Sequence, residues 1–241
     1  MRVPFIISCL FFSVLCQGQQ KVTFYASDSL KITADLYLKD YQLPFILLFH
    51  QEEGSRGEYS EIAHRLEKLD YNCLAVDLRV GGKMNYVQNE TAQRLADAGL
   101  HAEFLDARKD IEASIDYIRK FNQYPVVLFG SSFSASLCLM EARKNPNVKA
   151  VVAFSPGEYF RPVKIVKDEI QGLQKPVFVA TTELEYEYVV QMLSGIEDKY
   201  KTVYHPSNGR GIHGAKALWE SSPSANECWL DLMLFFKKIR Y

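Results

Sequence analysis

The sequence predicts an α/β fold, in which a mostly parallel central sheet has helices on both faces and begins with an antiparallel hairpin. Short apolar runs alternate with stretches of helical periodicity along most of the chain. Several of these runs are apolar at every position, as expected of parallel strands that are buried on both faces. The 241 residues and 48% hydrophobic content suit one packed domain, which we expect over residues 19–241.

The first residues have the pattern of a signal peptide. A basic start precedes an apolar run over residues 3–15, which is shorter than the roughly 20 residues of a membrane-spanning helix. Small residues at Cys16 and Gly18 favour cleavage after Gly18, so we expect a signal peptide over residues 1–18 and no stable membrane span. A buried first strand is the alternative, and lipid attachment at Cys16 is disfavoured by the large Leu15. The pattern therefore predicts a secreted or periplasmic protein.

The strands are expected in a regular order. Residues 22–26 and 30–38 flank a polar turn and resemble an antiparallel hairpin at the sheet edge. The later apolar runs predict buried parallel strands. These strands are expected at residues 44–49, 72–77, 126–129, 149–154, 175–181 and 201–205.

Helices are expected between these strands. Ile62, Leu66 and Leu69 recur on one helical face, and Ile111 and Ile115 do so later in the chain. The helical patterns cover residues 60–69, 107–121, 135–143, 166–173, 186–195 and 225–239. A polar stretch over residues 78–101 is longer than the usual connection of about 4 to 6 residues, and such inserts often border active sites.

Charge and cysteine content exclude several classes of function. A net charge of -1 lacks the clustered basic residues that neutralise phosphates, so we expect no nucleic-acid partner. Without the first 18 residues, an odd number of cysteines remains, which predicts no disulfide framework. Cys73 and Cys138 lie in apolar runs and are expected to be small buried residues. No Cys/His spacing fits zinc, so we expect no metal.

Residues 130–134, with the sequence G-S-S-F-S, lie between an expected strand and an expected helix, where a nucleophile elbow occurs. The tight turn needs small residues two positions before and two positions after the nucleophile. Gly130 and Ser134 satisfy this requirement for Ser132, whereas Ser131 would have phenylalanine at both positions. Ser132 is therefore the expected nucleophile, although Ser134 replaces the usual glycine. A merely serine-rich turn is the alternative.

A serine nucleophile needs a base, and in this type of fold the base comes last in the chain. His213 lies in a glycine-rich loop after the last expected strand and is the expected base, with His205 as its competitor. The acid should follow the strand at residues 175–181, where Glu185 is expected and Glu183 is the alternative. Both glutamates also fit the interpretation of solvated charges at a helix start.

An anionic tetrahedral intermediate needs backbone donors that are already in position. One is expected from Phe133, the residue after the nucleophile, and the other from Gln51, in the loop after the strand at residues 44–49. His50 is expected to give this loop its structure. Glutamine at position 51 replaces a usual glycine but keeps the N–H.

Together these segments resemble the α/β-hydrolase superfamily, nearest its dienelactone hydrolase-like branch. The resemblance covers nearly all of the mature chain. It rests on the segments Leu47-Leu48-Phe49-His50-Gln51, Ala75-Val76-Asp77, Asp110-Ile111-Glu112-Ala113-Ser114-Ile115-Asp116-Tyr117, Gly130-Ser131-Ser132-Phe133-Ser134 and Ile212-His213-Gly214.

The resemblance implies the α/β-hydrolase fold with a sheet of about eight strands, and hydrolysis of a small-molecule ester or related acyl substrate without a cofactor. The best-known members of this branch have a cysteine where this chain has Ser132, so the dienelactone substrate itself is not carried over. We expect a serine esterase. A peptidase of the same fold and a catalytically inactive relative that binds a ligand remain alternatives.

Overall fold

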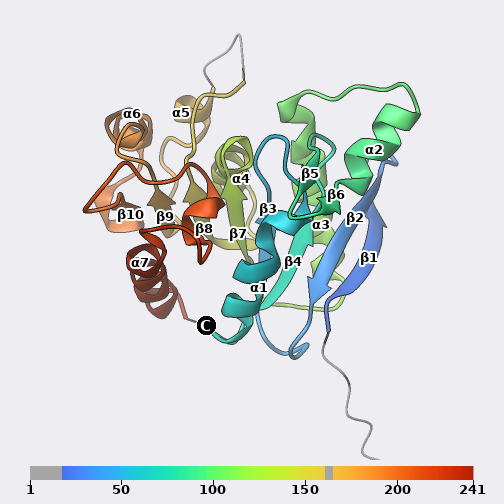
Figure 1. The fold of residues 1–241 in the computed structure, drawn as a ribbon, viewed down its shortest axis with the longest axis horizontal. Coiled ribbons are helices and arrows are strands. Elements are labelled where there is room, and N and C mark those ends of the chain that lie inside the picture. Colours follow the sequence, from blue (N-terminus) through green and yellow to red (C-terminus); the bar gives the residue numbers. More distant parts are fainter. Residues whose placement is uncertain (1–17, 161–164, 241) are drawn as a thin grey trace, which may run out of the picture.

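The computed structural model describes residues 18–160 and 165–240, so the expected signal peptide lies almost wholly outside the described residues. One eight-stranded sheet has the order β1-β2-β4-β3-β7-β8-β9-β10 (Figure 1). Its strands are β1 (Gln20–Tyr25), β2 (Lys31–Tyr37), β3 (Phe45–Phe49), β4 (Asn72–Val76), β7 (Val126–Ser131), β8 (Val148–Phe154), β9 (Val177–Ala180) and β10 (Lys201–Tyr204). β2 pairs antiparallel with β1 and β4, and every other pairing in this sheet is parallel. The predicted fold and its N-terminal hairpin are confirmed.

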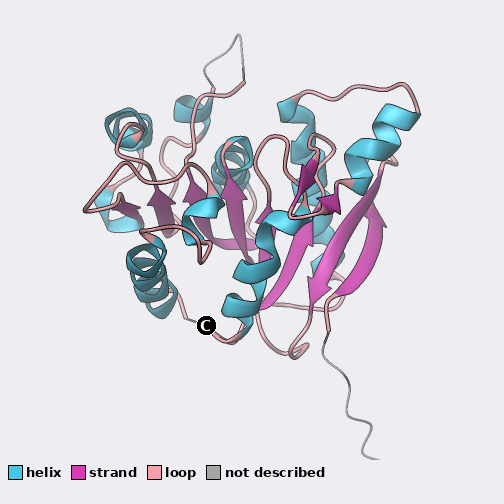
Figure 2. Ribbon diagram, viewed as in Figure 1, coloured by secondary structure: helices cyan, strands magenta, loops and turns pink. Residues whose placement is uncertain are grey.

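Helices cover both faces of the sheet, as Figure 2 shows. α3, α4, α5 and α6 pack on one face, and α1 and α7 pack on the other. The helices are α1 (Ser60–Glu67), α2 (Glu90–Asp97), α3 (Arg108–Arg119), α4 (Phe133–Lys144), α5 (Val166–Glu169), α6 (Tyr186–Met192) and α7 (Ala225–Lys238). α5 is shorter than the expected helix over residues 166–173, although Ile170 and Leu173 still pack in the core.

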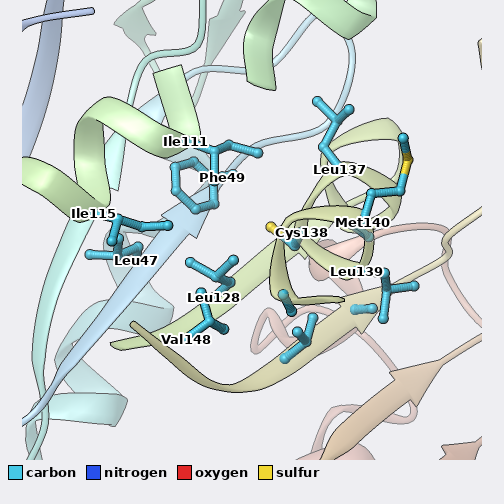
Figure 3. Close-up of a cluster of buried hydrophobic side chains, with 14 of the residues drawn as sticks. Leu47, Phe49, Ile111, Ile115, Leu128, Leu137, Cys138, Leu139, Met140 and Val148 are labelled. Atoms are coloured by element: carbon cyan, nitrogen blue, oxygen red, sulfur yellow. The ribbon is translucent and has the colours of Figure 1, made fainter. Parts of the chain in front are cut away.

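The central strands are apolar at every position because each face of the sheet has its own core. Leu47 and Phe49 of β3 point into the core below α3 and α4 (Figure 3). Ile46 and Leu48, the alternate residues of the same strand, point into the opposite core with α1 and α7. Side chains alternate across a strand, so burial on both faces removes the polar positions.

The polar stretch over residues 78–101 is more ordered than a loop. It forms a short hairpin, β5 (Lys83–Met84) with β6 (Val87–Gln88), followed by α2. The side chain of Asn89 accepts a hydrogen bond from Ala92 N at 2.8 Å and caps α2, while Thr91 Oγ1 accepts one from Thr33 N at 3.0 Å. The cap therefore fixes the start of α2, and one buried threonine attaches this mostly polar segment to β2.

Two buried arginines hold the segments around the sheet edge. Arg56 lies 2.5 Å from Asp77, and Arg79 lies 2.7 Å from both Asp110 and Asp28. Burial raises the pKa of Asp110 to about 6, although the Arg79 guanidinium opposes this shift. Removal of either arginine would leave a buried carboxylate without its counter-charge, which is a costly change.

The cysteines have the environment that the sequence predicts. Cys73, Cys138 and Cys228 are buried and unpaired, and burial raises the pKa of all three thiols. They are small core residues rather than reactive thiols. Within residues 18–160 and 165–240, no helix combines the length and apolar character needed to cross a membrane.

Candidate active site

Ser132 occupies a strained turn between β7 and α4. Its φ of 60° and ψ of −124° lie in a region that residues other than glycine rarely adopt. A Cβ at Gly130 would lie 2.5 Å from Ala135 Cα, so only glycine fits two positions before the serine. This crowding is the one that the sequence pattern predicts for a nucleophile elbow.

Ser134 is accommodated where glycine is usual because its hydroxyl is fully used. The hydroxyl donates to Phe49 O at 2.7 Å and accepts a hydrogen bond from Ser131 N at 2.9 Å. Both bonds are buried: the first joins the turn to the neighbouring strand β3, and the second closes the turn on itself. The serine therefore strengthens the turn instead of crowding it.

The structure brings Ser132, His213 and Glu185 into one hydrogen-bonded chain. His213 Nε2 lies 2.9 Å from Ser132 Oγ, and His213 Nδ1 lies 2.5 Å from Glu185 Oε1. Ser132 is 6% exposed and the His213 side chain is 43% exposed, so the site is open to solvent on the imidazole side. His205 instead packs against the ring of Tyr186, with ring centroids 4.4 Å apart.

Glu185 is held in its ionised form. Burial raises its pKa, but hydrogen bonds from His213, the Thr182 N–H and the Ser155 hydroxyl outweigh burial and lower the pKa to about 2. Its Oε2 atom accepts from Ser155 Oγ at 2.8 Å and from Thr182 N at 2.9 Å. Glu183, the alternative acid, is exposed, and its carboxylate makes no hydrogen bond within the described part of the chain. Geometry thus favours Glu185 over Glu183.

Ser155 is a site residue that the sequence reasoning missed. Its hydroxyl donates to Glu185 and accepts a hydrogen bond from Gly214 N at 3.0 Å. It has a φ of 50° directly after β8, another position in the left-handed region. A polar residue directly after the apolar end of a strand, beside the expected site, was the available signal.

The Gln51 amide differs from its expected role. It donates to Glu58 Oε2 at 2.8 Å, so its single proton points to a buried carboxylate and is not free to face an oxyanion. The Phe133 amide, in the first turn of α4, has no acceptor among the described residues, as expected of an oxyanion donor.

His50 gives the loop after β3 its structure, as expected. Burial lowers the pKa of His50 to about 4, so the ring is neutral near pH 7. Its Nε2 accepts from Leu78 N at 3.0 Å, so the ring proton is on Nδ1, which donates to Gln51 O at 2.7 Å. Over residues 18–160 and 165–240, no three His, Cys, Asp or Glu side chains form a cluster that could hold a metal ion.

The sheet order and the strained serine turn define an α/β hydrolase. The sequence model of the dienelactone hydrolase family matches residues 32–205, and the chain belongs to that family. A lactone is a cyclic ester, and the protein is accordingly a hydrolase that acts on ester bonds. No curated protein matches the chain significantly.

Solved structures of similar fold come from diverse sources. An esterase of Pyrococcus furiosus is 15% identical, with a TM-score of 0.70, and the match covers 99% of each chain. A dienelactone hydrolase from Anabaena variabilis is 18% identical, with a TM-score of 0.68, and the match covers 92% of this chain and 99% of that one. A dienelactone hydrolase-like promiscuous phosphotriesterase from metagenomic libraries is also 18% identical, with a TM-score of 0.63 and coverage of 92% and 98%.

Proposed function

We propose that this chain hydrolyses small carboxylic esters through an acyl-enzyme on Ser132. The observation that supports this most is the contact of 2.9 Å between Ser132 Oγ and His213 Nε2, together with the contact of 2.5 Å between His213 Nδ1 and Glu185. A serine hydroxyl is a weak nucleophile near neutral pH, so a base at hydrogen-bond distance is its main requirement.

The proposed reaction has two halves. An imidazole that donates its Nδ1 proton to Glu185 has its Nε2 lone pair free to take the proton of Ser132. The Ser132 oxygen adds to the ester carbonyl, and collapse of the tetrahedral anion expels the alcohol, which takes the proton from His213. Water then adds to the acyl-enzyme with His213 as base, and the carboxylic acid leaves.

The tetrahedral anion needs two donors, and we assign them to the amides of Phe133 and Glu52. The Phe133 amide directly follows the nucleophile. Since the Gln51 amide is bound to Glu58, the next amide of the same turn takes its place. The Glu52 amide has no acceptor among the described residues, and the turn is closed by a bond of 3.0 Å from Gly54 N to Gln51 O.

The test is fluorophosphonate labelling together with hydrolysis of p-nitrophenyl acetate. We expect the wild type to be labelled on Ser132 and Ser132→Ala to lose both labelling and hydrolysis. Ser194→Ala is the matched control, because it removes an exposed serine outside the site and should keep both labelling and hydrolysis. A wild type that resists the probe and leaves the ester intact would contradict the proposal and would favour a relative that only binds a ligand.

We also propose that residues 1–18 direct export, after which the mature chain begins at Gln19. The basic start and short apolar run support this. N-terminal sequencing of the chain recovered outside the cytoplasm tests it. A retained residue 1 on that material would contradict cleavage.

A further inference from the structure

Glu58 is a buried carboxylate that the proposed reaction does not use. It lies in a short 3₁₀ helix (Arg56–Tyr59) after β3 and is 0% exposed. Its Oε2 accepts the Gln51 amide at 2.8 Å, and its Oε1 accepts the Ser131 hydroxyl at 2.7 Å. A charge is rarely buried completely unless it is paired or has a function, and among the described residues the carboxylate of Glu58 is hydrogen-bonded by an amide and a hydroxyl and by no cation.

The contacts of Glu58 reach three segments of the site. Gln51 begins the turn that would provide the second oxyanion donor. Ser131 directly precedes the nucleophile, and its Oγ accepts a hydrogen bond from Ala215 N at 2.9 Å. Ala215 follows the expected base His213 by two residues. One carboxylate therefore joins the oxyanion turn, the nucleophile elbow and the histidine loop.

We propose that Glu58 is a positioning residue for the ester hydrolysis proposed above, and that its ionised carboxylate holds these three segments in their catalytic arrangement. The inference rests on that proposed function. Glu58 touches no reacting atom and acts through Gln51 and Ser131. Positioning of this kind affects the rate strongly, because small displacements of the reacting groups slow the chemical step.

The ionised form makes these hydrogen bonds strongest. As a carboxylate, Glu58 accepts the Gln51 N–H at one oxygen and the Ser131 O–H at the other, and hydrogen bonds to a charged acceptor are roughly twice as strong as neutral ones. A protonated carboxyl or an amide at position 58 can keep both contacts only by donating to the second lone pair of the Ser131 oxygen, so that the Ser131 proton must turn to another acceptor. Protonation of Glu58 should thus loosen the arrangement.

This ionisation falls within the range in which the enzyme would be assayed. Burial raises the pKa of Glu58 to about 7, against the opposing effect of the Gln51 amide, the Ser131 hydroxyl and the charges of Lys216 and His213. Tyr59, the remaining titratable neighbour, stays neutral because burial raises its pKa well above the ordinary value. Two groups, Glu58 and His213, must then be deprotonated for full activity.

The first experiment compares Glu58→Gln with wild type in p-nitrophenyl acetate hydrolysis across pH. We expect kcat to fall by about tenfold to a hundredfold with KM nearly unchanged. On the acid side near pH 7, log kcat should fall more steeply with decreasing pH in the wild type than in the variant, because the variant lacks the ionisation of Glu58. Wild-type kcat and slope in Glu58→Gln would overturn the proposal.

Two further variants keep the test decisive. Ser131→Ala removes a hydrogen bond to the ionised carboxylate of Glu58, which should raise the pKa of that group. The acid side of the kcat–pH profile should then move to higher pH. An unchanged profile would count against the proposal even if Glu58→Gln does not fold. Glu141→Gln is the matched control: this glutamate of α4 is 5% exposed, pairs with Asn145 at 2.8 Å and lies away from the elbow. It should behave as wild type.

Hydrogen–deuterium exchange separates this inference from the proposed function. In Glu58→Gln, peptides that contain Gln51 and Ala215 should exchange faster together, although they are far apart in sequence, and Glu141→Gln should affect neither. This readout does not depend on turnover. A wild type without esterase activity would refute the proposed function, whereas unchanged exchange at both peptides would refute the linkage by Glu58.

Discussion

The burial of Glu58 should make the stability of the fold depend on pH in a way that one substitution removes. The pKa of Glu58 rises from its ordinary value of 4.5 to about 7 because the carboxylate is buried. At about 1.4 kcal/mol per pH unit, this difference favours the protonated form in the folded chain by about 3.5 kcal/mol. The group is completely buried, so solvent screening does not reduce this magnitude appreciably.

The direction of this pH dependence follows from which state of the chain, folded or unfolded, keeps the proton on Glu58. Between pH 4.5 and about 7, the folded chain keeps a proton on Glu58 that the unfolded chain has lost. The stabilisation is therefore complete below pH 4.5 and is lost as the pH rises through about 7. From about pH 5 to about pH 8, the expected loss is about 2.5 kcal/mol. Glutamine at position 58 cannot ionise and should not show this loss.

The assay is urea unfolding of wild type, Glu58→Gln and Glu141→Gln at several pH values. Groups that titrate alike in both proteins cancel when the unfolding free energy of Glu58→Gln is subtracted from that of the wild type. From about pH 5 to about pH 8, the wild type should lose about 2 to 3 kcal/mol of unfolding free energy relative to the variant. Glu141→Gln serves as the comparison for removal of another buried glutamate. A wild-type to Glu58→Gln difference that varies by less than about 0.5 kcal/mol would refute the argument from burial.

Three other substitutions have expected outcomes. Glu185→Gln replaces a carboxylate with an amide that cannot stabilise an imidazolium, so kcat for p-nitrophenyl acetate should fall by about a thousandfold or more, and near-wild-type turnover would exclude this glutamate as the acid. Gly214→Ala places a Cβ 2.6 Å from Ser131 Oγ at a φ of 74°, so fluorophosphonate labelling should slow at least about tenfold, and an unchanged labelling rate would refute the predicted clash. Arg79→Ala leaves Asp110 buried without its partner and should lower the unfolding free energy by about 3 to 5 kcal/mol in urea titrations, whereas a loss below about 1 kcal/mol would mean that the pair is weakly coupled.

Most of the fold was predictable because its signals are local. A strand buried on both faces needs apolar residues throughout, and such runs are visible in the sequence without tertiary information. The choice of Ser132 over Ser131 was local too, because the crowding at Gly130 arises from the next few residues of the same turn. The expected positions of these elements therefore agree closely with the structure.

The predictions that failed concern residues whose roles depend on contacts between distant segments of the chain. The direction of the Gln51 N–H is set by Glu58 across a loop, and the sequence shows only that an amide exists there. Glu58 and Ser131 are 73 positions apart, and neither has a neighbour that marks it as one of a pair. Ser155 follows the apolar end of β8, but its partners Glu185 and Gly214 are likewise distant in sequence. The regular structure of residues 78–101 likewise depends on a hydrogen bond between Thr91 and β2, a strand far away in the sequence.

One consequence of these distant contacts concerns how an exposed, glycine-rich loop can hold a catalytic base. The two amides that follow His213 are each bound by a serine hydroxyl, Gly214 by Ser155 at 3.0 Å and Ala215 by Ser131 at 2.9 Å. Each serine in turn donates to a carboxylate, the proposed triad acid in one case and the buried glutamate after β3 in the other. Each serine hydroxyl is therefore used as both acceptor and donor, and the two bonds fix the backbone directly after the imidazole. Loss of one serine should loosen the loop while the other still holds it, so the double variant should lose more turnover than the two single losses predict together.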